Sequence, residues 1–340
     1  MNIQTCPCTL APGFQTYSAT GLKLMFGGKK VNHVLDFDAP EADESVAEKL
    51  RQNSTYISIS GAQFKQSLVL EKNKLRLTEP GETGHYILKT IPFRPQFGQK
   101  SSLPANEHLT MQIARQVYRL NTAQCALVFF KNGEPAYITK RFDYGSDGHK
   151  IPQEDFASIL GRTKALNGED YKNEGSYEEI AQMIKLTAAA YPVEIEKFFE
   201  LVLFNYLFNN GDAHLKNFSL QQPQPGDYLL SPAYDLINTR IHIPNDSFFA
   251  LTKGLFADDA DTESFKRLGY YGFDDFMEFG KRIGMLQNRI IAVLNKYRLE
   301  NQGVYKLTEQ SYLVDSMKRK YLELYKDRLR MLNNSHLGII

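Results

Sequence analysis

The dominant spacing of apolar residues changes close to residue 150, and this change restricts the fold more than any other feature of the sequence. Between residues 56 and 142, short apolar runs alternate with turn residues, which is typical of β-strands. From residue 153 onward, apolar residues recur at intervals of three and four, which is typical of amphipathic helices. The sequence therefore predicts an α+β protein with a strand-rich part followed by a helix-rich part.

Hairpin and helix patterns locate the individual elements. Asn132-Gly133 is a strong signal for a tight turn between two strands, and Lys72-Asn73 lies between two further short strands. We expect strands at Ser67–Leu70, Leu75–Leu77, Tyr86–Ile91, Cys125–Phe130, Ala136–Thr139, Phe218–Gln221 and Tyr228–Leu230. We expect helices at Ala105–Leu120, Gln153–Leu160, Ser176–Ala190, Val193–Phe208, Phe265–Tyr271, Asp274–Tyr297 and Thr308–Leu332. The second half of Val193–Phe208 is apolar almost all round, which predicts that it is buried.

Three segments are predicted from these patterns. Residues 1–55 mix Pro, Gly and acidic residues with one expected helix, Ser45–Leu50, and are interpreted as an N-terminal arm or docking segment. Residues 56–142 form the β-rich part, and residues 143–340 form the helical part. Cys6 and Cys8 form a C-x-C pair without a second pair or a nearby histidine, so structural thiols are favoured over a zinc site.

Charge and hydropathy exclude several classes of protein. The 40 Lys and Arg residues balance 39 Asp and Glu residues, which gives no indication of a strongly polyanionic partner. Basic residues near the C-terminus, such as Lys320 and Arg328, are interpreted as a solvated helix face. No apolar run approaches the roughly 20 residues that a membrane-spanning helix needs. The three cysteines are too few for a disulfide framework, so we expect no membrane association and a cytoplasmic location.

The loop after Val193–Phe208 carries the strongest chemical signal. Asn209-Asn210-Gly211-Asp212 alone would be interpreted as a helix cap and a turn. However, Asp212 is followed after four residues by Asn217, then by a short hairpin and a second acid, Asp235. Phosphoryl transfer needs an acceptor for the attacking hydroxyl's proton and oxygen ligands for Mg²⁺, and kinases take these from a D-x-x-x-x-N loop and a later Asp. Asp212, Asn217 and Asp235 fit these three roles.

Lys89 supplies a candidate cation for the triphosphate. It lies inside an apolar strand, on the face that Ile87 and Ile91 share. A lysine on a solvated edge strand is the ordinary alternative, but the acidic loop downstream favours nucleotide contact, and Glu107 is a candidate ion-pair partner. The small residues of Ser58–Lys65 could cradle phosphates, although they also fit an ordinary turn. The sequence has no P-loop or Rossmann glycine motif.

Taken together, these motifs resemble the HipA-like serine/threonine kinases, the toxins of bacterial toxin–antitoxin systems. The resemblance rests on six stretches in the same order: SISGAQFK (58–65), YILK (86–89), KRFD (140–143), PQEDF (152–156), NGDAHLKNFS (210–219) and SPAYD (231–235). It implies a two-lobed protein-kinase-like fold with a β-rich N-lobe and a helical C-lobe. ATP and Mg²⁺ would lie between the lobes.

The resemblance also implies a role for individual residues. Asp212 would be the catalytic base, and Asn217 and Asp235 would bind magnesium. The remaining nucleotide-binding residues would be a loop over the phosphates (Ser60, Gly61, Ala62, Gln63, Lys65), the phosphate-binding Lys89, a hinge for adenine (Lys140, Arg141, Phe142), and His214, Lys216 and Tyr234. Autophosphorylation would be expected at Ser58 and Ser60 and would add about two negative charges beside the nucleotide.

Activity and partners are also implied by the resemblance. A protein serine is the expected acceptor, and an aminoacyl-tRNA synthetase is the expected substrate, so that phosphorylation would arrest translation and growth. Residues 1–57 are too short for the N-terminal subdomain of full-length HipA proteins. The chain is therefore similar to short HipT-type kinases, whose partners are a HipB-like helix-turn-helix antitoxin and a separate HipS-like protein. Contact with DNA would occur only through the antitoxin.

Two other interpretations remain open. The G-D-x-H-x-x-N pattern also resembles the loop of aminoglycoside phosphotransferases, which are small-molecule kinases, although PQEDF and SISGAQFK favour the HipA side. A catalytically inactive scaffold that binds an antitoxin belongs to a different class. It would lack metal-dependent ATP binding, and substitution of Asp212 would have no effect on it.

Overall fold

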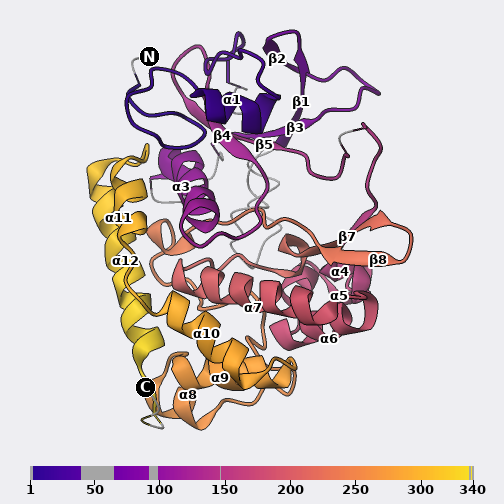
Figure 1. Ribbon diagram of the computed structural model, residues 1–340, viewed down its shortest axis with the longest axis vertical. Coiled ribbons are helices and arrows are strands. Elements are labelled where there is room, and N and C mark those ends of the chain that lie inside the picture. The colour runs from indigo at the N-terminus through magenta and orange to yellow at the C-terminus, as the bar shows by residue number, and fades with distance from the viewer. Residues whose placement is uncertain (1–2, 40–64, 92–98, 146, 337, 339–340) are drawn as a thin grey trace. The chain divides into compact units, whose positions relative to one another are not determined.

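The structure is a computed structural model that describes residues 3–39, 65–91, 99–145, 147–336 and 338. The chain forms two compact units. Unit 1 contains the described residues of Met1–His149 together with Ile241–Ile243 and Gln302–Arg319, and unit 2 contains Lys150–Arg240, Pro244–Asn301 and the described residues of Lys320–Ile340. Figure 1 labels the elements of both units. Within the described residues, no helix combines the length and the apolar character that crossing a bilayer requires.

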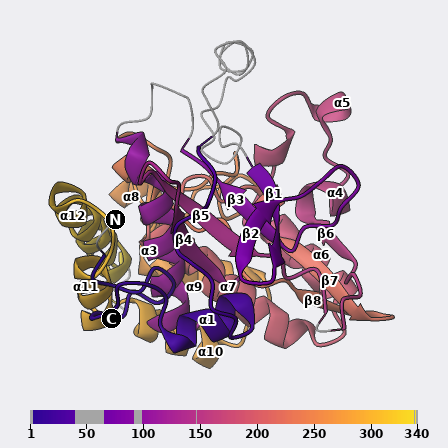
Figure 2. The ribbon, with the colours of Figure 1, turned by 90° about the horizontal axis from the view of Figure 1, so that it is seen from above.

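Unit 1 is built on an antiparallel sheet in the order β2-β1-β3-β5-β4, which Figure 2 shows from above. The β1–β2 and β4–β5 hairpins confirm the predicted strand pairs, and Gly133 has a φ of +84°, as a tight turn between strands requires. The strands are β1 (Lys65–Glu71), β2 (Lys74–Leu77), β3 (Tyr86–Lys89), β4 (Cys125–Phe129) and β5 (Pro135–Lys140).

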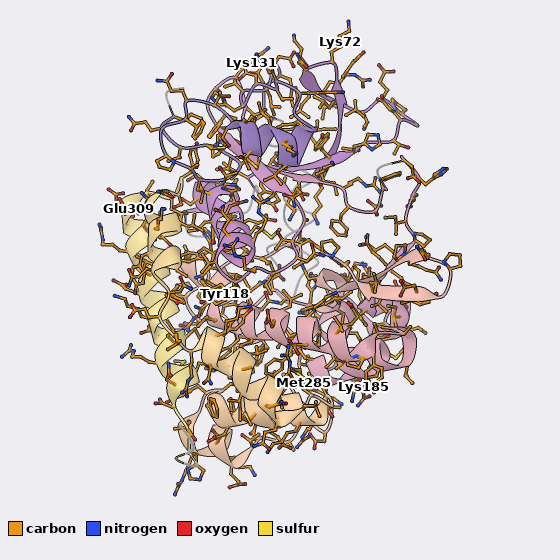
Figure 3. The ribbon with its side chains drawn as sticks, viewed as in Figure 1. Lys72, Tyr118, Lys131, Lys185, Met285 and Glu309 are labelled. Atoms are coloured by element: carbon orange, nitrogen blue, oxygen red, sulfur yellow. The ribbon has the colours of Figure 1, made fainter. Side chains whose placement is uncertain are left out.

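The helices of unit 1 pack on this sheet. Helix α3 (Leu103–Gln116) contacts β4 and β5, and α11 (Gln302–Glu309) contacts α3. Tyr118, labelled in Figure 3, is 2% exposed just after the end of α3. The prediction extended this helix to Leu120, but Arg119 has a φ of +62°, which a helix cannot accommodate.

The N-terminal segment is part of the core of unit 1, so the prediction of an arm is wrong for its described residues. Cys6, Cys8 and two residues of α1 (Ala19–Phe26), Met25 and Phe26, pack in one apolar cluster with residues of the sheet. Pro7 accepts a hydrogen bond from Leu127 N–H on β4. All three cysteines are free thiols and buried. The segment was misjudged because its Pro and Gly residues form turns, whereas its scattered apolar residues cover the sheet. The predicted helix Ser45–Leu50 lies outside the described residues.

Unit 2 combines helices with a small sheet. The helices are α4 (Phe156–Ile159), α5 (Lys164–Asn167), α6 (Tyr177–Thr187), α7 (Tyr191–Leu207), α8 (Glu263–Leu268), α9 (Phe273–Arg282), α10 (Gln287–Tyr297) and, from Lys320 on, α12 (Asp315–Asn333). The strands β6 (Gln153–Asp155), β7 (Ser219–Gln224) and β8 (Asp227–Leu230) form an antiparallel sheet in that order. Helix α7 is buried along its second half, as predicted.

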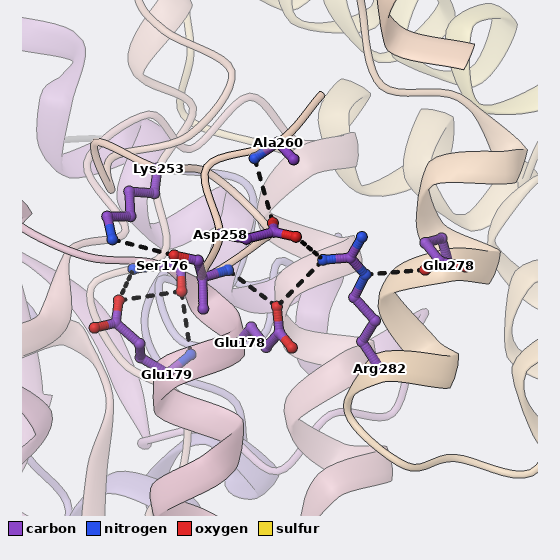
Figure 4. Close-up of polar contacts among 9 residues, drawn as sticks. Ser176, Glu178, Glu179, Lys253, Asp258, Ala260, Glu278 and Arg282 are labelled. Carbon is purple, nitrogen blue, oxygen red and sulfur yellow. Dashed lines mark hydrogen bonds and ion pairs between the residues drawn. The ribbon is translucent and has the colours of Figure 1, made fainter. Parts of the chain in front are cut away.

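A polar network stabilises the start of α6 (Figure 4). Ser176 and Glu179 form a capping box, in which each side chain accepts a hydrogen bond from the other residue's backbone N–H. Glu178 accepts a hydrogen bond from Ala257 N–H at 2.9 Å. Arg282 of α9 forms ion pairs with Asp258 and Glu278, each at 2.9 Å. The network therefore joins α6 and α9 through the loop that contains Ala257 and Asp258.

Three predicted helices were wrong in extent. Residues 153–155 of the predicted helix Gln153–Leu160 form β6, because they pair with β7, and Asp155 then caps α4. The predicted helix Asp274–Tyr297 is divided into α9 and α10, where Gly284 has a φ of +83°. The predicted helix Thr308–Leu332 is divided into α11 and α12 by residues 310–314. Strand pairing and turns outweighed local helical periodicity at these positions.

Candidate functional site

The predicted catalytic loop begins directly after α7. Asn209 has a φ of +54°, the left-handed conformation in which Asn often ends a helix. Asn210 donates from Nδ2 to Asn205 Oδ1 at 2.9 Å, and its own Oδ1 accepts from Asp212 N–H at 3.3 Å. The buried end of α7 therefore holds the backbone on which Asp212 is placed.

Asp212, His214 and Asn217 are close together in this loop, and each is less than one-tenth exposed. His214 Nε2 lies 3.9 Å from Asp212 Oδ1. Burial lowers the pKa of His214 to about 4, although the neighbouring Asp212 opposes this shift. His214 is therefore neutral at pH 7. Asn217 N–H donates to His214 O at 2.8 Å, which closes a backbone turn between these two residues.

The carboxamide oxygen of Asn217 is the clearest indication of a missing ligand. Among the described residues, this buried Oδ1 has no hydrogen-bond partner. An unsatisfied buried acceptor costs about 1–3 kcal/mol, and Mg²⁺ is a ligand that would satisfy it, because it prefers oxygen donors. The described residues contain no cluster of three or more His, Cys, Asp and Glu side chains suited to a metal. Mg²⁺ in kinases needs only one or two protein oxygens besides the phosphates, so Asn217 and Asp235 fit this ion.

Asp235 and Tyr234 follow the β7–β8 hairpin. Asp235 has a φ of +57°, a strained conformation that is enriched at functional sites. Tyr234 Oη donates to Lys216 O at 2.8 Å and shares a hydrogen bond with Ser219 Oγ. The SPAYD segment is therefore joined to the predicted catalytic loop at Lys216, which directly precedes Asn217, the other predicted metal ligand.

Lys216 forms an ion pair with a residue whose role the sequence did not predict. Lys216 Nζ lies 2.7 Å from Asp155 Oδ2, and Asp155 Oδ1 accepts from Ser158 N–H as the cap of α4. Asp155 is part of PQEDF, so this contact explains why that motif accompanies the catalytic loop. The pairing of β6 with β7 positions Asp155, and a local helical pattern could not indicate it.

Thr239 and Asp246 are two further residues that the sequence analysis missed. Thr239 Oγ1 accepts from Gly211 N–H at 3.0 Å, and Thr239 and Asp246 are hydrogen-bonded to each other. A Cβ atom at Gly211 would lie 2.2 Å from Asp246 Oδ2, so only glycine fits beside this carboxylate. No motif marks Thr239 or Asp246 in the sequence. Gly211 was the one signal in the sequence, because a glycine beside the predicted catalytic aspartate can indicate that another residue packs closely there.

In unit 1, Lys89 forms the ion pair that was suggested by the sequence. Lys89 Nζ lies 2.5 Å from Glu107 Oε1, and each side chain is 3% exposed. Nζ also lies 5.2 Å from the centre of the Tyr137 ring. Lys65 is the direct partner of Lys89 across β1 and β3, so two lysines occupy opposed positions on one face of the sheet. Two opposed cations favour an anionic ligand near this face.

The predicted hinge begins at Lys140, the last residue of β5. Lys140 N–H donates to Gln124 O, and Arg141 N–H donates to His85 O. Arg141 also pairs with Asp143 at 2.6 Å. Phe142 is partly exposed. Two backbone N–H groups of the predicted hinge therefore already donate to carbonyl oxygens of the protein itself.

Of the predicted loop Ser58–Lys65, the structure describes only Lys65. Ser58, Ser60, Gly61, Ala62 and Gln63 lie outside the described residues. Lys65 is the first residue of β1.

Comparison with known proteins identifies the family. Residues 57–301 match the model of the HipA-like C-terminal domain. A Haemophilus influenzae protein named "Putative kinase" is 29% identical over 331 residues, which cover 93% of this chain and 92% of that protein. A Sinorhizobium fredii protein named "Putative kinase Y4dM" is 31% identical over 229 residues, which cover 63% of this chain and 53% of that protein.

A solved structure shares the fold. It belongs to the Shewanella oneidensis toxin–antitoxin complex of HipA, HipB and operator DNA, and it matches with a TM-score of 0.61 and 20% identity over 86% of this chain and 72% of that chain. This likeness confirms the predicted α+β, kinase-like fold class. The matched residues 57–301 include all six motifs from which the resemblance was drawn. The chain therefore belongs to the HipA-like C-terminal domain family.

Proposed function

We propose that this protein is an ATP- and Mg²⁺-dependent kinase that transfers the γ-phosphoryl group to a serine of a protein. The observation that carries the proposal is the buried Oδ1 of Asn217, which has no partner among the described residues and lies in the same loop as Asp212. Bound Mg²⁺ would neutralise charge on the phosphates. Asn217 and Asp235 would hold it.

In this mechanism, Asp212 accepts the proton of the attacking hydroxyl. Kinase chemistry requires mainly correct positioning and charge stabilisation. The hydrogen bonds of Asn210, Gly211 and His214 fix the loop around Asp212. Neutral His214 places no imidazolium charge beside the Asp212 carboxylate. Lys89, held by Glu107, would bind phosphate oxygens, and Lys65 would add a second positive charge.

The finer assignments are part of the proposal. The family membership supports a toxin that is bound by a HipB-like antitoxin, and the named complex of HipA with HipB shows that such an assembly exists for a protein of this fold. A HipS-like second partner, autophosphorylation at Ser58 or Ser60, an aminoacyl-tRNA synthetase as substrate and a cytoplasmic location remain predictions from the resemblance.

Phosphate transfer from radiolabelled ATP tests the proposal. The purified chain is incubated with Mg²⁺, [γ-³²P]ATP and a bacterial lysate, beside Asp212→Asn and the matched control Asp227→Asn. Asp227 is a partly exposed residue at the start of β8. We expect labelled protein with the wild type and the control, and none with Asp212→Asn. Label on small molecules alone would favour the small-molecule kinase, and equal labelling by all three proteins would refute the role of Asp212.

A further inference from the structure

Arg328 of α12 is a buried cation with an unusual set of partners, so the prediction that it lies on a solvated helix face is wrong. Its side chain is 1% exposed and lies between two aromatic rings, with the guanidinium carbon 4.7 Å from the centre of Tyr206 and 4.4 Å from the centre of Phe248. Burial lowers the pKa of Arg328. Among the described residues, no carboxylate lies within ion-pair distance of it. Its strongest hydrogen bond goes instead from Nε to the neutral Oδ1 of Asn209, at 2.8 Å.

Asn209 is the first residue of the catalytic loop, and its polar groups are fully engaged. Its Nδ2 donates to Leu324 O on α12 at 3.3 Å. Its carbonyl oxygen accepts from both Thr239 N–H and Thr239 Oγ1, each at 2.9 Å. Helix α12 therefore holds both ends of the Asn209 carboxamide. This fixes the left-handed conformation in which α7 ends and the loop begins.

Stability alone explains this arrangement poorly. Taking a charge out of water is costly, and even a buried ion pair can often be replaced by apolar side chains without loss of stability. A guanidinium paired with an amide gains less than one paired with a carboxylate. A positioning role accounts for an arginine at position 328, because two rings hold the planar guanidinium so that one of its N–H groups points at Asn209.

We propose that Arg328 is a positioning residue of the kinase, which acts through Asn209 to hold Asp212 in place for phosphoryl transfer. Asp212 lies only three residues after Asn209, so a rotation at Asn209 moves it directly. Arg328 also lies beyond residue 301, where the family match ends. A helix outside the matched region thus completes the loop. The catalytic part of this inference rests on the proposed function.

A double-mutant cycle tests whether Arg328 acts through Asn209. Arg328→Met removes the hydrogen bond and keeps much of the apolar volume, and Asn209→Gly removes the acceptor while glycine tolerates the positive φ. We expect each single variant to lower kcat about a hundredfold with an unchanged KM for ATP, since small misplacements of reacting groups cost this much. The double variant is expected to lose no more than either single one. Losses that multiply would show independent packing effects and overturn the proposal.

Arg298→Met is the matched control. Arg298 of unit 2 also lies over an aromatic ring, 5.6 Å from the centre of Phe273, but it makes no contact with the catalytic loop among the described residues. We expect kcat at the wild-type value. A fall equal to that of Arg328→Met would contradict a specific role for Arg328.

Hydrogen exchange supplies a second measurement that does not depend on activity. In Arg328→Met we expect amide exchange to rise at least about tenfold in peptides covering residues 209–215 and to stay unchanged in α9. Equal increases throughout unit 2 would overturn the proposal. If the wild type transfers no phosphate but the exchange result holds, the proposed function fails while Arg328 still positions the loop. If Arg328→Met does not fold, both kcat and amide exchange are measured in Asn209→Gly. A kcat and an exchange rate equal to those of the wild type in Asn209→Gly would refute the proposal.

Discussion

Lys89 Nζ lies 2.5 Å from Glu107 Oε1 in the interior of unit 1, where each side chain is only 3% exposed. The pair joins strand β3 to helix α3. A buried cation needs such a partner, because an isolated charge in a low-dielectric interior is strongly unfavourable. In the proposed mechanism, the same partner would orient the lysine for a phosphate.

Removing the acid of this pair is expected to destabilise the protein. Glu107→Gln leaves Lys89 buried without a counter-charge, and breaking a buried pair in this way costs about 3–5 kcal/mol. Denaturant unfolding measures the change. Glu82→Gln is the control, because its ion pair with Arg76 is exposed to solvent and we expect little effect there. Equal losses in both variants would mean that burial of the Lys89–Glu107 pair is not what matters.

Substitution of Asn217 is expected to weaken magnesium binding specifically. Asn217→Ala removes the buried oxygen, and we expect the Mg²⁺ concentration for half-maximal ATP binding to rise about tenfold, which corresponds to about 1.4 kcal/mol. Isothermal titration of ATP at several Mg²⁺ concentrations measures it. Asn217→Asp keeps an oxygen ligand and should retain binding. Asn295→Ala, at an exposed position on α10, should behave as the wild type. A Mg²⁺ requirement that is the same in Asn217→Ala and the wild type would contradict the metal assignment.

A side chain at position 211 is expected to disturb the catalytic loop. The Cβ of Gly211→Ala would lie 2.2 Å from Asp246 Oδ2, so the loop or the carboxylate must move. Overpacking of this kind costs about 1–3 kcal/mol. The second variant Gly211→Ala/Asp246→Ala removes the obstructing carboxylate and should recover stability in thermal unfolding. No recovery of stability in the double variant would show that the close approach to Asp246 does not cause the loss.

His108 is expected to make the stability of the protein depend on pH. Burial, with a smaller effect of Arg115, lowers the pKa of His108 from 6.5 to about 3, although a hydrogen bond to Cys8 O opposes the shift. Between these values the unfolded chain binds a proton that the folded protein does not. The stability that the neutral His108 contributes is therefore fully present above pH 6.5, and it is lost as the pH falls toward 3.

Urea unfolding at pH 7.5 and pH 5 measures this dependence. His108→Gln should reduce the difference between the two midpoints, whereas His149→Gln, at an exposed position, should leave it unchanged. An unaltered difference in His108→Gln would show that other groups cause the pH dependence.

Strong local signals allowed much of the fold to be predicted. The Asn132-Gly133 turn identified β4 and β5, and the apolar run of Val193–Phe208 identified a buried α7. Weak local signals failed. The segment Gln153–Asp155 has a helical pattern but pairs with β7, and Gly284 divides a helix that periodicity had extended. Pairing partners and left-handed residues decide such boundaries, and neither is visible in a short window of sequence.

The order of acid, amide and lysine residues by itself predicted phosphoryl transfer, because Asp212, Asn217, Asp235 and Lys89 are recognisable by type and spacing. Only the tertiary structure decided what holds them. Asp155, Thr239, Asp246 and Arg328 come from distant elements, and their contacts depend on burial and on approach between segments separated by up to 119 residues. Motifs identify the residues that would react. The contacts that hold these residues in place are set by packing, which depends on the whole chain.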